Sequence, residues 1–369
     1  MKQDWEIKKI KDICDKASSN IAQNKITELD GDYPVFGASG YVQNVDFYHQ
    51  NTEYIGIVKD GSGVGRVNKY PAYSSLLGTL QYILPKEGYD LNYVAYALKS
   101  LNLAEYASGA AIPHIYFKDY GEETIAVPPR EEQERIVAEL DCLSGVIEKK
   151  KQQLKELDAL AQSIFYQMFG DPITNEKGWE VDRLGNLCEI SSSKRIYAHE
   201  YCENGVPFYR GKEISEKSKG NDISVELYIS EERYSELKNK FGVPQIGDIL
   251  LTAVGTIGNI WVVDSNTPFY FKDGNVLWLQ AKENINPIYF KALLYNLIDK
   301  YKESMANGCA YSALTIVNLK EMQTNKIPFA LQQEFANKIE AIEKQKELIK
   351  QSITQTEELF NSRMDYYFN

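Results

Sequence analysis

The residues best suited to bind an anion surround a glycine-rich stretch, Gly61-Ser62-Gly63-Val64-Gly65, which follows Lys59 and precedes Arg66. Glycine permits a tight backbone turn, so backbone N–H groups can point at one phosphate with Lys59 and Arg66 beside it. Ser62 belongs to the same candidate site. A plain glycine hairpin between two strands would have the same composition, and this alternative stays open. Nucleotide binding is disfavoured because no Gly-Lys-Ser or Gly-Lys-Thr string follows.

Other candidate contacts combine cations, aromatic residues and hydroxyls. His114 stands next to Tyr116 and Lys118, although a lone histidine is more often a capping or core residue. Cations near aromatic residues suit contacts with a nucleic-acid groove, through hydrogen bonds and stacking on sugars, but a solvated loop has the same composition. Further along the chain, Thr252-Ala253-Val254-Gly255-Thr256 parallels the first glycine turn and offers the hydroxyls of Thr252 and Thr256 in place of cations. The remaining candidates are Lys194, Arg195, Arg210 and Lys212.

Catalytic and metal chemistry find little support in the sequence. Adenine methyltransferases carry an Asn/Asp-Pro-Pro-Tyr/Phe loop, whereas the nearest string, Asn286-Pro287-Ile288-Tyr289, lacks the second proline and is predicted to open a helix. No glycine-rich cofactor loop precedes it, and the clustered carboxylates of a nuclease are not evident. We therefore expect no catalytic residue, no cofactor and no metal in this chain. The chain has five cysteines, Cys14, Cys142, Cys188, Cys202 and Cys309. They form no CxxC pair and have no metal spacing with the three histidines, so we expect a reduced, cytoplasmic protein.

A long amphipathic stretch over residues 131–168 must position these candidates. Its apolar residues alternate in steps of four and three, with one vacancy at Lys150, which predicts a helix packed along its length against another helix. Such a helix would be about 57 Å long, at about 1.5 Å per residue. Gly170-Asp171-Pro172 is typical of a helix end. The interface residues expected on this helix are Ile136, Leu140, Leu143, Ile147, Leu154 and Leu157.

A second stretch with the same pattern runs from Leu331 to the C-terminus. Polar Lys346 and Thr356 interrupt its apolar series, and we expect Lys150 and Lys346 to set helix register. The two stretches begin alike, Val127-Pro128-Pro129-Arg130-Glu131-Glu132-Gln133 matching Ile327-Pro328-Phe329-Ala330-Leu331-Gln332-Gln333 position by position. Two helices that each carry a row of apolar side chains can bury these side chains against each other. The expected interface residues on the second are Phe335, Ile339, Ile342, Ile349 and Ile353.

Landmarks before each long helix also recur in the same order. Residues 5–14 match residues 179–188 with Trp, Glu and Cys in identical places, and residues 107–111 match residues 306–310. Between them we expect mixed strands and helices, including strands over 54–58 and 276–280, helices over 91–103 and 287–305, and a polar loop over 215–222. The predicted division is a first domain over 1–130, a helix over 131–170, a second domain over 171–329 and a helix over 330–369.

Length, composition and charge limit the remaining possibilities. The chain has 369 residues, 43% of them hydrophobic, which can fill two or three ordinary cores. Its polar start and the absence of a long apolar run predict no secretory leader and no membrane span. The net charge is −11, and acidic residues exceed basic ones by two or three in each of the four predicted parts. No segment is a basic arm, so DNA binding would require cations gathered on one face or supplied by a partner.

Together these motifs resemble the specificity subunit of type I restriction-modification systems. The resemblance covers essentially the whole chain and is carried by the tandem landmarks, above all by the Pro-Pro-Arg-Glu-Glu-Gln string at residues 128–133 after Ser108-Gly109-Ala110-Ala111-Ile112-Pro113-His114-Ile115. The second copy departs from it at Tyr311-Ser312-Ala313-Leu314. The implied fold is α+β, with two similar mixed target recognition domains separated by two long helices that form an antiparallel, pseudo-two-fold symmetric coiled coil.

The resemblance also implies function and partners. Each domain would read one half of a split site in double-stranded DNA, and the coiled coil would set the spacer and dock two modification (methyltransferase) subunits. The modification subunits would use S-adenosylmethionine to methylate adenine. Two restriction (motor-nuclease) subunits would use ATP and Mg²⁺ to cut DNA. A 57 Å rod spans about 17 base pairs. The alternative is a non-catalytic coiled-coil scaffold joining two protein-binding domains.

Overall fold

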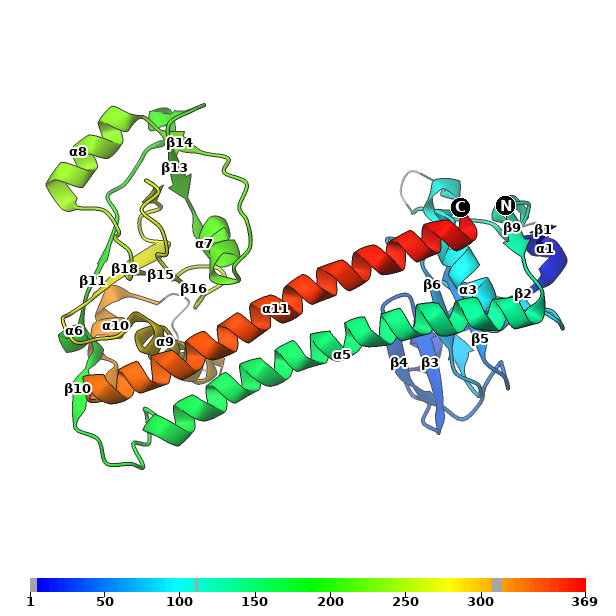
Figure 1. The fold of residues 1–369 in the computed structure, drawn as a ribbon, viewed down its shortest axis with the longest axis horizontal. Coiled ribbons are helices and arrows are strands. Elements are labelled where there is room, and N and C mark those ends of the chain that lie inside the picture. Colours follow the sequence, from blue (N-terminus) through cyan, green and yellow to red (C-terminus); the bar gives the residue numbers. More distant parts are fainter. Residues whose placement is uncertain (1–4, 110–111, 307–313) are drawn as a thin grey trace. The chain divides into compact units, whose positions relative to one another are not determined.

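The computed structural model describes residues 5–109, 112–306 and 314–369, which form two compact units (Figure 1). Unit 1 is Met1–Gln152 with Ile349–Asn369, and unit 2 is Gln153–Leu348. Both mix helices with sheets, so the predicted α+β class is confirmed. Ala110, Ala111 and the repeat residues 307–313, including Cys309, lie outside the described part.

Unit 1 is built on a four-stranded antiparallel sheet in the order β2-β8-β5-β6. Its central strand β5 is buried at every position, as its sequence Tyr-Ile-Gly-Ile-Val predicts. The strands are β2 (Cys14–Ser18), β8 (Leu80–Pro85), β5 (Tyr54–Val58) and β6 (Val67–Tyr70), covered by α3 (Leu91–Ser100). A smaller sheet holds β4 (Gly40–Val45), β3 (Tyr33–Gly37) and β7 (Ser75–Leu76), and β1 (Glu6–Lys9) pairs with β9 (Thr124–Val127). Short helices are α1 (Ile10–Ile13), α2 (Gln23–Ile26), η1 (Leu103–Tyr106) and α4 (Phe117–Tyr120).

Unit 2 repeats this plan with longer insertions. Its main sheet has the order β11-β18-β15-β16, from β11 (Cys188–Ser192), β18 (Val276–Ala281), β15 (Ile249–Thr252) and β16 (Ile260–Val262). A second sheet holds β12 (Tyr201–Cys202), β14 (Tyr228–Ile229), β13 (Val206–Tyr209) and β17 (Tyr270–Phe271), and β10 (Val181–Arg183) pairs with β19 (Gln323–Asn325). The helices are α6 (Leu184–Leu187), η2 (Ala198–Glu200), α7 (Gly211–Ser218), α8 (Glu231–Phe241), α9 (Pro287–Ala306) and α10 (Ile316–Glu321).

The predicted loop over 215–222 is wrong in its first half, because α7 continues to Ser218. The first turn of α7 is stabilised by Glu213, whose carboxylate accepts the backbone N–H of Arg210 at 2.8 Å. Ile214 is fully buried beneath the same turn. A cap and one buried apolar residue therefore hold a helix whose exposed residues are polar.

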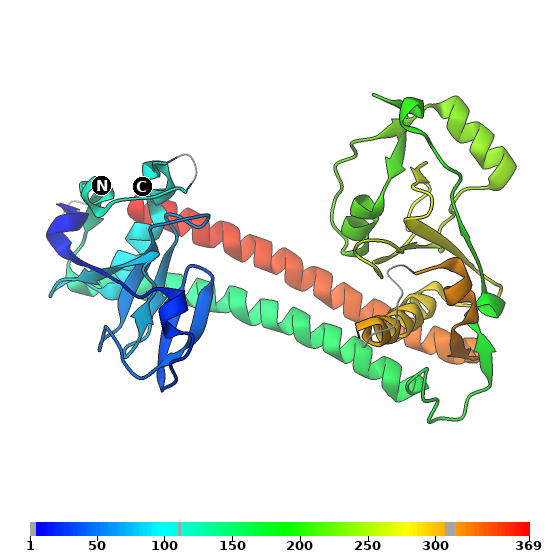
Figure 2. The same cartoon turned by 180° about the vertical axis from the view of Figure 1, so that it is seen from behind.

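The long helices α5 (Arg130–Phe169) and α11 (Phe329–Phe368) each contain 40 residues, and part of each belongs to each unit. In unit 1, Arg363 Nε lies 2.8 Å from Glu139 Oε1, and Lys150 Nζ donates to Thr356 Oγ1 at 3.4 Å. In unit 2, Lys346 Nζ lies 2.7 Å from Asp158 Oδ1. Partner numbers fall along α11 as they rise along α5, so the packing is antiparallel within each unit, as predicted (Figures 1 and 2).

The residues predicted at the coiled-coil interface are all at least partly buried. Phe335 packs edge-on against Phe165 and Phe169, with ring centroids 5.8 and 5.3 Å apart. The buried members of the set are Ile136, Leu140, Ile147, Phe335, Ile342 and Ile353, and the partly buried ones are Leu143, Leu154, Leu157, Ile339 and Ile349.

A buried glutamine fixes the start of each long helix. Gln133 donates to Pro128 O at 2.9 Å and accepts the N–H of Asp90, the residue that caps α3, at 2.9 Å. The equivalent of Gln133 in unit 2 is Gln332, which donates to Ile327 O at 2.8 Å and accepts the N–H of Asn286 at 2.9 Å.

These bonds correct the register of the sequence repeat. The alignment that matched Gln133 with Gln333 and Pro128 with Pro328 is wrong by one residue. The carbonyl of Pro129 accepts N–H groups from the first turn of α5 as that of Pro328 does from α11, so Pro129 is the equivalent of Pro328. The error arose because two adjacent prolines precede one helix and two adjacent glutamines begin the other.

Candidate nucleic-acid interface

The glycine-rich stretch of unit 1 is the turn between β5 and β6. Gly65 N–H donates to Val58 O at 2.9 Å, and Val58 N–H donates to Arg66 O at 3.0 Å, which is hairpin geometry. Gly65 has φ +86°, and a Cβ there would lie 2.6 Å from the backbone nitrogen of Ala104. Glycine is therefore required by both conformation and space.

Most backbone N–H groups of this turn are already used inside unit 1. Those of Gly61, Val64, Gly65 and Arg66 donate to Pro113, Gly61, Val58 and Gly63 carbonyls, at 2.9 to 3.2 Å. The turn therefore does not offer a set of free backbone N–H groups to one phosphate. Its side chains, Lys59, Ser62 and Arg66, carry the capacity to bind an anion.

Arg66 is oriented by two carbonyls. Its Nη2 donates to Ala38 O at 3.0 Å and its Nε to Gly63 O at 3.3 Å. A Cβ on Gly63 would lie 1.9 Å from Nη2, so glycine makes room for the guanidinium. Arg66 is exposed, and among the described residues it has no carboxylate partner. Lys59, in contrast, lies 3.6 Å from Asp60.

His114 joins the same part of unit 1. Its Nδ1 is hydrogen-bonded to the Asp60 carboxylate, and its ring centroid lies 4.0 Å from that of Tyr116. Lys118 Nζ lies 5.2 Å from the Tyr116 ring centroid. The structure thus links Lys59, His114 and Lys118 through Asp60 and Tyr116, whereas Ser62 and Arg66 lie on the glycine turn that follows Asp60.

In unit 2 the turn after β15 matches the glycine turn of unit 1. Gly258 N–H donates to Thr252 O as Gly65 N–H donates to Val58 O. The Thr252 hydroxyl donates to Thr256 O at 2.6 Å and accepts the N–H of Asn259 at 3.0 Å. Thr252 is 1% exposed, so its hydroxyl holds the turn together, whereas Thr256 is exposed.

Strand β17 and the residues just after it contact Lys194, Arg195 and the neighbour of Arg210. The backbone N–H of Lys194 donates to the Tyr270 hydroxyl at 2.8 Å, and Lys194 Nζ lies 4.7 Å from the Phe241 ring centroid. Arg195 Nε lies 2.9 Å from Asp273 Oδ2. On the other side, residue Tyr209, which precedes Arg210, pairs with Phe271.

Arg210 and Lys212 share carboxylates. Arg210 Nη2 lies 3.0 Å from Glu213 and 2.7 Å from Glu226, and Lys212 Nζ lies 2.6 Å from Glu226. Hydrogen bonds from Lys212 and then Arg210 lower the pKa of Glu226 to about 2. These cations are neutralised in the free chain and would have to exchange carboxylates for phosphates.

The string Asn286-Pro287-Ile288-Tyr289 opens α9, as predicted. Asn286 Oδ1 accepts the N–H groups of Ile288 at 2.9 Å and Tyr289 at 3.2 Å. Tyr289 is buried with its ring 5.0 Å from that of Phe169. The string therefore caps a helix and packs the end of α5.

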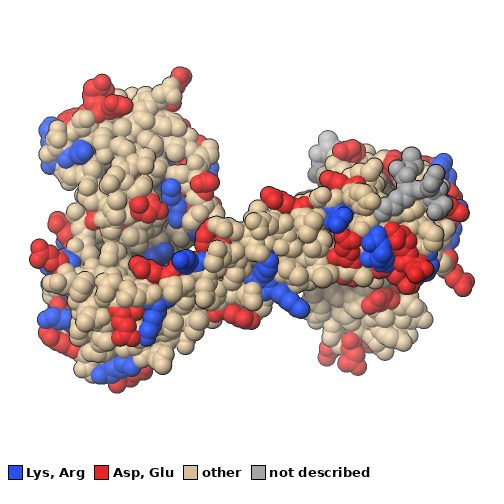
Figure 3. All heavy atoms as spheres, in the orientation of Figure 1, with Lys and Arg blue, Asp and Glu red and all other residues tan. Residues whose placement is uncertain are grey.

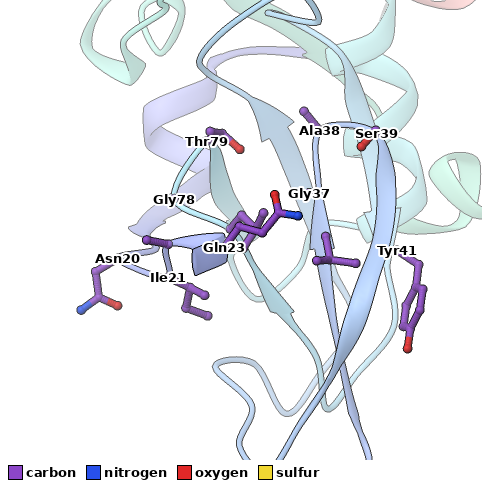
Figure 4. A pocket seen from close by; sticks show the side chains of 12 residues that line it. Asn20, Ile21, Gln23, Gly37, Ala38, Ser39, Tyr41, Gly78 and Thr79 are labelled. Atoms are coloured by element: carbon purple, nitrogen blue, oxygen red, sulfur yellow. The ribbon is translucent and has the colours of Figure 1, made fainter. Parts of the chain in front are cut away.

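Unit 1 has a groove of about 700 Å³ that no sequence pattern predicted (Figure 4). It lies between the β3–β4 turn, residues 20–23 and residues 77–79, and Arg66 lies on its rim through the bond to Ala38. The only local signal is the Gly37-Ala38-Ser39-Gly40 turn. Its lining residues are Asn20, Ile21, Ala22, Gln23, Gly37, Ala38, Ser39, Tyr41, Val42, Leu77, Gly78 and Thr79.

Three further observations concern the surface charge, metal ligands and membrane-spanning helices. Figure 3 shows Lys and Arg side chains interspersed with Asp and Glu on the face in view. Within the described residues, no three His, Cys, Asp or Glu side chains gather as metal ligands would. None of the described helices has both the length and the apolar character needed to cross a membrane.

Known proteins are similar to this chain in sequence and in fold. A Haemophilus influenzae protein assigned as a type I restriction enzyme specificity subunit is 23% identical over 351 residues, 92% of this chain and 87% of that protein. The MjaIX type I restriction enzyme specificity subunit of Methanocaldococcus jannaschii is 27% identical over 279 residues, 64% of each chain. The crystal structure of the type I restriction-modification S subunit from M. genitalium superimposes with a TM-score of 0.60 at 17% identity, covering 99% of this chain and 96% of that one.

The family profile described as the type I restriction modification DNA specificity domain matches twice, at residues 2–159 and 176–358. Each match contains the glycine-turn candidates of one unit and the start of one long helix. The chain therefore belongs to the family of type I restriction-modification DNA specificity domains, present here as a tandem pair.

Proposed function

We propose that this chain is the sequence-specific DNA-binding specificity subunit of a type I restriction-modification complex. The observation that supports it is the double family match on a fold whose two units repeat the strand order of the main sheet. Each unit would read one half of a bipartite site in double-stranded DNA. The family match favours this function over a coiled-coil scaffold for two protein-binding domains.

The four-part division made from the sequence provides the mechanical roles. Residues 1–130 and 171–329 would be the recognition domains, and the helices over 131–170 and 330–369 would set the spacer and dock the modification subunits. Lys59, Ser62, Arg66, His114 and Lys118 would contact DNA from the first domain. Lys194, Arg195, Arg210, Lys212 and Thr256 would do so from the second, with Thr252 shaping its turn.

Catalysis would belong to the partners. As a specificity subunit the chain has no chemistry of its own. It would act in the cytoplasm with two modification subunits that use S-adenosylmethionine and two restriction subunits that use ATP and Mg²⁺. The residues described here would bind and orient the DNA for those subunits.

The test is a domain exchange in the assembled methyltransferase. The adenines methylated in host DNA are mapped with this chain, without it, and with residues 1–130 replaced by another such domain. We expect the methylated motif to depend on this chain and the exchange to alter one half of it. A change in both halves, or methylation independent of the chain, would refute the proposal. Binding that does not weaken steeply with salt would instead support the scaffold.

A further inference from the structure

The groove on unit 1 has a chemical character that differs from its surroundings. None of its twelve lining residues carries a charge. Half of them are Gly, Ala, Ser or Thr, and Asn20, Gln23, Ser39 and Thr79 bring amide and hydroxyl side chains at exposed positions. A neutral groove with hydrogen-bonding side chains suits the edges of bases better than phosphates, which favour cations.

The walls of the groove are held by hydrogen bonds within unit 1. Gly78 N–H donates to Ile21 O at 2.8 Å, and Leu77 N–H donates to Phe36 O at 2.8 Å. The buried Ile26 anchors α2, and the Gln43 amide donates to Leu29 O at 3.2 Å just beyond it. Gln23 therefore projects from a helix whose position is already set before any ligand binds.

Cationic side chains lie at the rim of the groove and not inside it. Arg66 Nη2 donates to Ala38 O, and Ala38 is itself a lining residue. The backbone N–H of Lys59 donates to Thr79 O at 3.0 Å, so the glycine turn also adjoins the groove at Thr79. A duplex whose phosphates contact Arg66 would present its base edges next to the groove.

Gln23 is the central polar group. Figure 4 shows its side chain extending from α2 into the groove, toward the wall that contains Gly37, with Thr79 and Ser39 on either side of the upper part. A glutamine amide offers one acceptor and one donor side by side, which matches N6 and N7 of adenine in the major groove. Within the described part of unit 1, the Gln23 amide has no hydrogen-bond partner.

We propose that this groove is a base-reading site, in which Gln23 recognises an adenine of one half-site while Arg66 holds a neighbouring phosphate. Ser39 and Thr79 contact the adjoining base edge. The inference deepens the proposed function and rests on it, since it assigns a specificity-determining residue to a DNA reader.

The experiment uses the full chain assembled with its modification subunits and a duplex library randomised in both half-sites. Gln23→Ala is compared with Asn24→Ala, an exposed amide on the same helix that does not line the groove. We expect Gln23→Ala to lower the preference for adenine at one position of one half-site by about tenfold. The other half-site, and every position with Asn24→Ala, keep the original preference.

The outcomes separate this inference from the proposed function. If the unsubstituted complex selects no sequence, the proposed function fails. If it selects a bipartite sequence that Gln23→Ala leaves unchanged at every position, the groove assignment alone is overturned. A uniform loss of binding to all sequences with Gln23→Ala would also overturn it, because it would make Gln23 a backbone contact. Gln23→Glu gives a second check, with a shift from adenine toward cytosine, whose N4 donates to a carboxylate.

Discussion

The cations of the two units differ in how their charge is compensated. Arg66 is held by two carbonyl oxygens and keeps its charge available, whereas Arg195, Arg210 and Lys212 each lie within 3.0 Å of a carboxylate. Neutral carbonyls orient a guanidinium without cancelling its charge, while carboxylates must be displaced before a phosphate can bind. Arg66 is therefore expected to make a stronger phosphate contact than Arg195, Arg210 or Lys212.

Arg66→Ala should weaken DNA binding by the assembled complex about equally for all sequences. One phosphate contact fewer lowers the slope of log affinity against log salt by about 1. A salt titration of binding measures this slope. Lys9→Ala is the control, because Lys9 already pairs with Glu122 at 2.9 Å in the same unit. An unchanged slope with Arg66→Ala would exclude Arg66 from the phosphate contacts.

The buried Glu213 should make the stability of unit 2 depend on pH. Burial raises its pKa, but hydrogen bonds from the Arg210 side chain and backbone outweigh burial and bring it below the ordinary 4.5. A carboxyl with a lowered folded pKa stabilises the fold fully above its unfolded pKa, and this stabilisation is lost as pH falls through the folded value.

Glu213→Gln is therefore expected to lower the free energy of unfolding by about 1–2 kcal/mol at pH 7. The difference should shrink as pH falls below about 4.5, as measured by urea unfolding across that range. Glu216→Gln on the same helix is the control, since Glu216 makes an exposed pair with Lys219 and should change stability by less than about 0.5 kcal/mol. A pH-independent difference for Glu213→Gln would contradict the assignment.

At the scale of elements, the long helices are joined to the units by buried polar contacts as well as by apolar packing. Gln133 and Gln332 each connect the first turn of a long helix to the cap of the helix that covers the main sheet. Lys346 lies in the apolar interface with its ammonium between Asp158 and Glu343. Such groups favour one register because any other would leave them unpaired, so register setting by Lys150 and Lys346 stays our prediction.

Gln332→Leu should destabilise unit 2 by about 2 kcal/mol or more. It leaves the Asn286 N–H and the Ile327 carbonyl without their partner at a site that is 1% exposed. Denaturant unfolding of the full chain measures the loss. Gln333→Leu, next to it but exposed, should change stability by no more than about 0.5 kcal/mol. If Gln333→Leu were the more destabilising of the two substitutions, the original alignment of Gln133 with Gln333 would be correct.

At the scale of the whole molecule, duplication is the organising feature. The strand order of the main sheet, a capped helix that packs on it and the family profile each occur twice in one chain. Two DNA readers joined by helices of 40 residues would contact two sites separated by an unread spacer. The length of the helices then determines which spacer is preferred.

Shortening both helices should shorten that spacer. Deletion of residues 144–150 from α5 and of the opposing residues 352–358 from α11 preserves the heptad pattern and removes about 10 Å. We expect the distance between the methylated half-sites to fall by about three base pairs. Mapping methylated adenines with the shortened complex provides the measurement, and an unchanged spacer would exclude a rigid ruler.

Much of this organisation was predictable from local patterns. The four-three spacing of apolar residues predicted both long helices and their packing, because helix periodicity is set by neighbours along the chain. The recurrence of Trp, Glu and Cys near the start of each predicted domain predicted the duplication. Two errors were also local. Consecutive prolines and glutamines allowed a shift of one residue, and the polar composition of 215–218 hid the short helix α7.

By itself, the sequence determined the helices, the tandem order, the family and the residue types available to bind DNA. Only the tertiary structure decided which of those residues are free to do so. Arg66 donates a hydrogen bond to the carbonyl of Ala38, and Arg210 donates one to the carboxylate of Glu226. Gln23 faces a groove formed by residues 37–41 and 77–79. These partners are 14 to 56 residues apart in the chain. Hydrogen bonding and charge compensation act through space, so spacing along the chain carries no record of them.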